Sequence, residues 1–212
     1  MAARPATVVL LHGLWMNAAA MGLLARALRR AGLRTARIGY RPMREPMEMH
    51  LGRVALALGA CDAGPVHLLG HSLGGLVALH ALALPEAARV QRVLLLGSPV
   101  SGCESATRLA ALPGGRGLMG RALDILSHPF GSVPGIEGSP QVASIAGTRA
   151  FGLGRLVLGS AAAGDGVVSV EETRLPGMAA HRAIAVSHSG MLFSREVARQ
   201  SVAWLRDGAF AS

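Results

Sequence analysis

The sequence predicts an α/β protein with a mostly parallel sheet and helices on both faces. Short apolar or β-branched runs alternate along the chain with longer Ala/Leu-rich or amphipathic stretches, which is the order of repeated strand–helix–strand units. Runs such as 7–11 and 66–69 are almost entirely apolar, as expected for strands that are covered on both faces. A parallel sheet with two helical layers satisfies both observations.

The expected strands share a short, apolar or β-branched composition and lie at 7–11, 33–40, 66–69, 90–97, 141–147 and 181–187. The expected helices lie at 17–30, 47–59, 74–84 and 189–206. Asn17 can cap the first of these and Gly32 can end it. Apolar residues recur at helical spacing along the second and the last. We find no repeat or linker, so the 212 residues predict a single domain, 1–212.

Regular periodicity is interrupted between residues 98 and 140, where glycine and proline are frequent. Within this segment one helix is expected at 116–128, and a further irregular excursion is expected at 148–164. A long irregular insertion is typically a functional or mobile loop, so 98–140 is a candidate lid. An ordinary connecting loop with one packed helix fits the same pattern.

All 21 basic residues are arginine, against 12 acidic residues, and the formal net charge is +9. A solvated surface in an acid-poor protein explains this balance, and weak contact with an anionic membrane surface is the alternative. One Tyr and four Phe provide few stacking platforms for single-stranded nucleic acid. No nucleic-acid motif is present either, so we expect no nucleic-acid partner.

Hydrophobic residues form 51% of the chain. The stretch 63–88 carries only one charged residue, Glu86, but its histidines, proline and glycines favour a buried strand and helix over a membrane span. An apolar N-terminal run interrupted at His12 is not typical of a signal peptide, which predicts a cytoplasmic protein. Cys61 and Cys103 are then expected to be free thiols, and neither has metal-ligand spacing.

The run Gly-His-Ser-Leu-Gly-Gly at 70–75 is the most informative motif. It stands between an expected strand and an expected helix, which is the context of a nucleophile elbow. Such a turn lifts the serine hydroxyl clear of the sheet, so Ser72 is a candidate nucleophile. A glycine-rich structural turn would leave the same pattern, and further catalytic groups are needed to distinguish the two.

A general base is expected after the last strand, and His188 lies there. The acid should lie between nucleophile and base in the chain, where Asp165 stands in a Gly-Asp-Gly turn. Glu104 is the alternative acid, and Glu171 and Glu172 are weaker candidates.

An oxyanion hole requires two backbone N–H donors. The residue after the nucleophile, Leu73, supplies one, and the loop after the first strand supplies the other, with Leu14 as the expected donor. His12 is expected to hold this loop. Residues that follow Leu14 or lie in the insertion are candidates for an acyl pocket: Trp15, Met16, Leu118, Met119 and Phe130.

Three segments together resemble the α/β-hydrolase superfamily, and within it the lipase-like and esterase-like members. They are Leu-His-Gly-Leu at 11–14, the run at 70–75, and Asp-Gly-Val-Val-Ser at 165–169 followed by His188. The last segment is similar to the acid turn of bacterial triacylglycerol lipases, which implies Asp165 as the acid. Those lipases often bind calcium near that turn, but aspartates are sparse in this chain, and we expect no metal and no cofactor.

The resemblance implies a serine hydrolase that cleaves small-molecule or lipid esters through a Ser-His-Asp triad and an acyl-enzyme. Three alternatives share the motif. A thioesterase or an acyltransferase would use the same groups, and a hydrolase-like binding module would not use them for catalysis.

Overall fold

The computed structural model describes residues 4–133, 140–150 and 163–212. In these ranges six strands form one fully parallel sheet with the order β2-β1-β3-β4-β5-β6. The strands are β1 (Thr7–Leu11), β2 (Arg34–Ile38), β3 (Val66–His71), β4 (Val90–Leu96), β5 (Gln141–Gly147) and β6 (Ala180–Ile184). The predicted α/β architecture is therefore confirmed, with strand ends that differ from expectation by a few residues.

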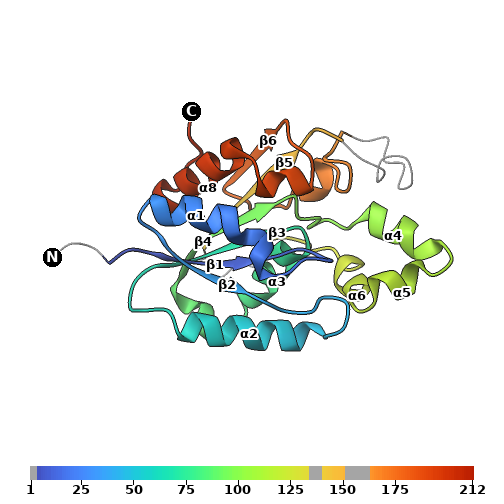
Figure 1. The fold of residues 1–212 in the computed structure, drawn as a ribbon, viewed down its shortest axis with the longest axis horizontal. Coiled ribbons are helices and arrows are strands. Elements are labelled where there is room, and N and C mark those ends of the chain that lie inside the picture. Colours follow the sequence, from blue (N-terminus) through green and yellow to red (C-terminus); the bar gives the residue numbers. More distant parts are fainter. Residues whose placement is uncertain (1–3, 134–139, 151–162) are drawn as a thin grey trace.

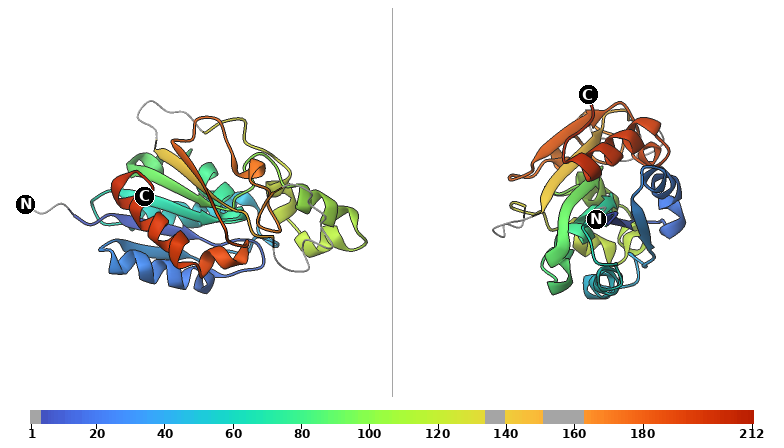
Figure 2. Two further views of the ribbon diagram at one scale, coloured as in Figure 1. Left: turned by 90° about the horizontal axis from the view of Figure 1, so that it is seen from above. Right: turned by 90° about the vertical axis from the view of Figure 1, so that its left-hand side faces the viewer.

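Helices cover both faces of the sheet (Figures 1 and 2). One face carries α1 (Gly22–Arg30) and α8 (Arg195–Asp207), and the other carries α2 (Met47–Gly59) and α3 (Leu73–Ala81). Each face of the sheet has its own hydrophobic core. Because successive residues of a strand point to opposite faces, Leu10 belongs to the core under α1 and α8, and Leu11 belongs to the core under α2 and α3. This alternation explains why β1 and β3 are apolar throughout.

Two predicted helices begin differently in the structure. The helix expected at 17–30 starts as a 3-10 turn, η1 (Ala18–Met21), and Asn17 caps that turn by accepting a hydrogen bond from Ala19 N–H at 2.9 Å. The helix expected at 189–206 is divided into η4 (Ser189–Leu192) and α8. Ser194 begins α8 by accepting from Val197 N–H at 3.3 Å, a cap that restarts the helix.

The insertion forms a group of short helices beyond the end of the sheet (Figure 2). They are α4 (Glu104–Ala111), α5 (Gly115–Met119) and α6 (Ala122–Leu126), while residues 134–139 of the insertion lie outside the described residues. The prediction of one helix at 116–128 is wrong, and α4 was not expected. Gly120 breaks the helix with a φ of 53°, and a Cβ there would lie 2.3 Å from the Met43 carbonyl oxygen.

The apolar stretch 63–88 forms β3 and α3 together with 3-10 helix η2 (Pro85–Arg89), as the strand-and-helix interpretation expected. Within the described ranges, no helix combines the length and the apolar composition needed to cross a membrane. Most of the excursion expected at 148–164 falls on residues 151–162, which lie outside the described residues.

The turn between β3 and α3 packs backbone directly against backbone. A Cβ at Gly70 would lie 2.4 Å from the Gly74 carbonyl oxygen and 2.4 Å from the Gly75 nitrogen. A Cβ at Gly74 would lie 2.4 Å from the Leu11 carbonyl oxygen. Because no flexible side chain can move aside at these points, only glycine fits without a shift of the main chain.

We predict that Gly70→Ala lowers the free energy of unfolding by about 1–3 kcal/mol, the typical cost of overpacking. The matched control is Gly52→Ala in the middle of α2, where an added Cβ meets no atom within 4 Å. The control should gain about 0.5–1 kcal/mol from higher helix propensity. Urea denaturation of both variants measures the difference, and equal stability of the two would contradict the packing argument.

Candidate active site

Ser72 occupies a strained turn at the carboxyl end of β3. Its φ of 55° and ψ of −125° place a non-glycine residue in a sparsely populated backbone region. The Ser72 N–H donates to the Leu96 carbonyl oxygen at 2.8 Å, which ties the turn to the neighbouring strand β4. The serine side chain is thereby directed into a cavity at this edge of the sheet.

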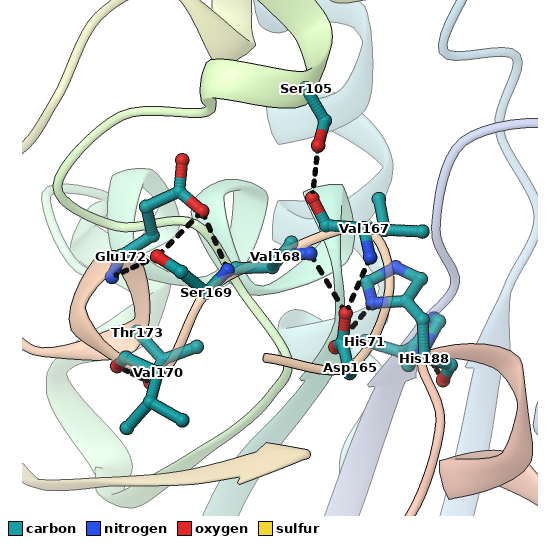
Figure 3. Close-up of polar contacts among 10 residues, drawn as sticks. All are labelled: His71, Ser105, Asp165, Val167, Val168, Ser169, Val170, Glu172, Thr173 and His188. Atoms are coloured by element: carbon teal, nitrogen blue, oxygen red, sulfur yellow. Dashed lines mark hydrogen bonds and ion pairs between the residues drawn. The ribbon is translucent and has the colours of Figure 1, made fainter. Parts of the chain in front are cut away.

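His188 and Asp165 lie against each other at the same edge (Figure 3). His188 Nδ1 is 2.7 Å from Asp165 Oδ2, and the Asp165 side chain is buried. The other carboxylate oxygen accepts from the N–H groups of Val167 at 2.9 Å and Val168 at 2.8 Å. The main-chain N–H of His188 also donates to the main-chain carbonyl oxygen of Asp165 at 3.0 Å. These bonds fix the carboxylate and orient the imidazole with Nδ1 toward it.

The other acid candidates lie elsewhere. Glu104 is exposed and pairs with Arg108, one helical turn along α4. Glu171 is exposed and pairs with Arg174 at 3.4 Å. The Glu172 carboxylate accepts hydrogen bonds from Ser169 in its own loop. Of the carboxylates considered from the sequence, Asp165 is the one that the structure places against His188.

His71, next to Ser72, contacts the candidate base His188. Its Nε2 is 3.0 Å from the His188 carbonyl oxygen, and the two rings lie 4.8 Å apart. Complete burial, with repulsion from His188 as a smaller cause, lowers the pKa of His71 to about 3. A neutral His71 donates its Nε2 proton to this carbonyl and so holds the main chain of His188. Its position before the serine was visible in the sequence, but its partner 117 residues away was not.

The loop after β1 packs against the elbow. A Cβ at Gly13 would lie 3.1 Å from the Ser72 Cβ, so this loop runs directly beside the candidate nucleophile. The Tyr40 hydroxyl donates to the His12 carbonyl oxygen, and His12 Nδ1 donates to the Gly13 carbonyl oxygen at 2.9 Å. His12 is thus placed as a holding residue of the loop. The loop continues into Leu14, which lines the cavity with Ser72.

Two N–H groups near Ser72 are available as donors. In the part of the chain that the structure describes, the N–H of Leu14 donates to no acceptor. Leu73 is the first residue of α3, where N–H groups have no partner within the helix. The positive end of the α3 dipole also faces this position. The arrangement can therefore stabilise a developing negative charge beside Ser72.

The cavity has a volume of about 270 Å³ and a mostly apolar lining that includes Ser72 and His188. Of the five candidate pocket residues, Trp15, Met16 and Met119 line it. Leu118 is exposed, and its carbonyl oxygen accepts from Trp15 Nε1 at 3.1 Å. Phe130 packs against His80, with ring centroids 4.7 Å apart.

Sequence reasoning did not select most of the other lining residues, many of which come from the insertion and from the turn at 165–169. They include Cys103, Ala106, Leu109, Leu126, Val167 and Val168. Burial raises the pKa of the Cys103 thiol to about 12, so the thiol stays protonated and acts as an apolar wall.

Hydrogen bonds join the acid turn to helix α4 (Figure 3). The Ser105 hydroxyl donates to the Val167 carbonyl oxygen at 2.6 Å. The Glu172 carboxylate accepts from Ser169 N–H at 2.7 Å, from the Ser169 hydroxyl at 3.0 Å and from Glu104 N–H at 2.6 Å. Glu172 thereby closes the loop that carries Asp165 and fastens it to the start of the insertion.

Within the described ranges, no group of three or more His, Cys, Asp and Glu side chains has the arrangement of a metal site. Ser72 at its strained strand–helix turn and His188, which is paired with Asp165, line one cavity of a parallel α/β sheet, an arrangement typical of α/β hydrolases.

Comparisons with known proteins agree with this class. An α/β-hydrolase family model matches residues 49–133. The lipase BlEst2 of Bacillus licheniformis in its mature form has a TM-score of 0.76 at 21% identity, over 91% of this chain and 88% of that one. The monoacylglycerol lipase of Paleococcus ferrophilus has a TM-score of 0.63 at 17% identity, over 96% and 95% of the two chains. Phospholipase PlaB of Legionella pneumophila has a TM-score of 0.70 at 14% identity, over 94% and 57%.

The chain has the α/β-hydrolase fold and resembles its lipase- and esterase-like members. No curated protein sequence matches it significantly.

We predict that Glu172→Ala destabilises the protein by about 1–2 kcal/mol, because three donors lose a common acceptor. Glu171→Ala is the control, since that side chain is 82% exposed and makes only a surface pair. Thermal or urea unfolding measures both. A loss of stability in the control as large as that in Glu172→Ala would contradict the structural role of Glu172.

Proposed function

We propose that this protein is a serine hydrolase that cleaves carboxylic esters, with Ser72 as nucleophile, His188 as base and Asp165 as the acid that orients it. The observation that carries the proposal is the 2.7 Å contact between His188 Nδ1 and Asp165 Oδ2 beside the cavity that Ser72 lines. With Nδ1 bonded to the carboxylate, the Nε2 of a neutral His188 is the acceptor left for the Ser72 proton. The lipase and esterase neighbours support the same chemistry.

The reaction proceeds in two halves. The Ser72 hydroxyl attacks the ester carbonyl and passes its proton to His188, and the tetrahedral oxyanion accepts hydrogen bonds from the N–H groups of Leu14 and Leu73. His188 then gives the proton to the departing alcohol and leaves an acyl-serine. A water molecule, deprotonated by His188, releases the carboxylic acid and restores the hydroxyl on Ser72. The Asp165 carboxylate stabilises the imidazolium.

The aliphatic cavity is the site proposed for the acyl chain. Its walls come largely from the insertion, through Leu109, Met119 and Leu126. Burial of an apolar chain there contributes binding energy in proportion to the area removed from water. We extend the proposal to residues 98–140 as the cover of this pocket. A thioester would meet the same nucleophile, base and oxyanion donors.

We predict that a fluorophosphonate probe labels the protein and that Ser72→Ala abolishes labelling, because the probe reacts with an activated serine. His188→Ala should reduce it strongly. Ser189→Ala is the matched control, since Ser189 lines the same cavity beside the base and should still be labelled. Gel fluorescence gives the readout. A well-folded wild-type protein that is not labelled would refute the proposed activity.

We predict that Asp165→Asn lowers kcat by roughly four orders of magnitude, because the amide favours the wrong tautomer of the imidazole. Glu104→Gln should leave kcat unchanged, since Glu104 pairs with Arg108 on the surface. Steady-state hydrolysis of p-nitrophenyl butyrate measures both variants. If Glu104→Gln lowers kcat and Asp165→Asn leaves it unchanged, Glu104 and not Asp165 is the acid.

A further inference from the structure

A second cavity, of about 770 Å³, lies next to the catalytic one. Trp15 and Met16 line both cavities, so these two residues form the boundary between them. The remaining walls come mainly from the loop between β2 and α2, which carries Arg41 and Arg44, together with Asn17 and with Arg53 on α2. The two cavities differ in character, since the catalytic lining is aliphatic and the second lining is rich in guanidinium groups.

The charge in the second cavity is not balanced within the protein. Glu45 is the acidic residue of its lining, and Arg53 neutralises it through a contact of 2.7 Å. Among the described residues, the side chains of Arg41 and Arg44 make no hydrogen bond and no ion pair. Arg41 and Arg44 are therefore exposed residues of the cavity wall whose guanidinium groups have no partner among the described residues.

The loop that carries these arginines is held by its own hydrogen bonds. The Arg41 carbonyl oxygen accepts from the N–H groups of Arg44 and Glu45, each at 3.0 Å. The Arg41 N–H donates in turn to the Glu45 carboxylate at 3.0 Å. The Met43 carbonyl oxygen accepts from Arg121 N–H at 3.1 Å, which anchors the loop to the insertion. A closed and anchored turn presents the two guanidinium groups from a fixed main chain.

We propose that this second cavity binds an anionic group, a carboxylate or a phosphate, carried by the leaving alcohol or thiol of the substrate. The inference rests on the proposed function. The aliphatic cavity suits the acyl chain, so the leaving group of a substrate held at Ser72 extends past Trp15 into the second cavity. Arg41 and Arg44 there offer planar donors that match carboxylate and phosphate oxygens.

Two butyrate esters test the proposal: that of p-hydroxybenzoate, whose leaving group is anionic, and that of methyl p-hydroxybenzoate, whose leaving group is neutral. In Arg41→Gln/Arg44→Gln, kcat/KM for the anionic ester should fall by about tenfold or more, as expected for losing charge-assisted hydrogen bonds. The neutral ester should be unaffected. Chromatography of the released phenols gives both rates.

Arg26→Gln/Arg30→Gln is the matched control. It removes the same charge from exposed positions on α1, and α1 ends at Arg30 near the start of β2, away from the carboxyl ends of the strands. This control should leave both esters unchanged. The proposal is overturned if the control lowers turnover of the anionic ester equally, if both esters lose equally in Arg41→Gln/Arg44→Gln, or if neither loses.

Binding without catalysis separates this proposal from the proposed function. Phenyl phosphate should bind to Ser72→Ala, as measured by calorimetry, and Arg41→Gln/Arg44→Gln in that background should abolish binding. Binding that survives the arginine changes would overturn the anionic site even if esters are hydrolysed. If phenyl phosphate binding depends on the two arginines but a fluorophosphonate does not label the wild-type protein, the anionic site is supported and the proposed hydrolase activity is refuted. Binding to phosphatidylglycerol vesicles but not to phenyl phosphate would overturn the substrate site in favour of a lipid surface.

Discussion

The close approach of main chain to main chain at the carboxyl ends of β1 and β3 is the constraint on which the site depends. A Cβ at Gly74 would lie only 2.4 Å from the Leu11 carbonyl oxygen, and one at Gly70 would lie only 2.4 Å from main-chain atoms of Gly74 and Gly75. The strand, the turn and the helix are therefore locked into one arrangement. Ser72 can keep a φ of 55°, at a cost of about 1–3 kcal/mol, because its surroundings leave no alternative.

The same edge of the sheet brings together groups that are far apart in the chain. In a parallel sheet all carboxyl ends of the strands lie at one edge, where binding sites of open α/β sheets form. The loop after β1 supplies Leu14, the turn after β3 supplies Ser72, and the loop after β6 supplies His188. The acid turn is fastened separately, through Glu172 and through the bond from Ser105 to Val167. The insertion is thus part of the support of Asp165 as well as a wall of the cavity.

Sequence reasoning succeeded where the signal is local. Alternating runs gave the parallel sheet, and the elbow motif placed Ser72 at a strand–helix turn. Chain order placed His188 and Asp165 at the same edge, although their catalytic roles stay predictions. Sequence reasoning failed where a contact between residues far apart in the chain determines the local structure. The helix ends at Gly120 because the Met43 carbonyl oxygen lies close to it. Phe130 does not line the cavity because its ring packs against His80. Neither partner is adjacent in sequence.

Trp15 connects these parts of the molecule. It has a φ of 57°, its side chain is 55% exposed, and its indole N–H is bound to the Leu118 carbonyl oxygen. It therefore joins the loop that carries Leu14 to helix α5. Because it also separates an aliphatic cavity from one lined by Arg41 and Arg44, any displacement of α5 would change both cavities together. Under the proposed function, this arrangement couples the position of the insertion to recognition of both halves of the ester, without a change at Ser72 itself.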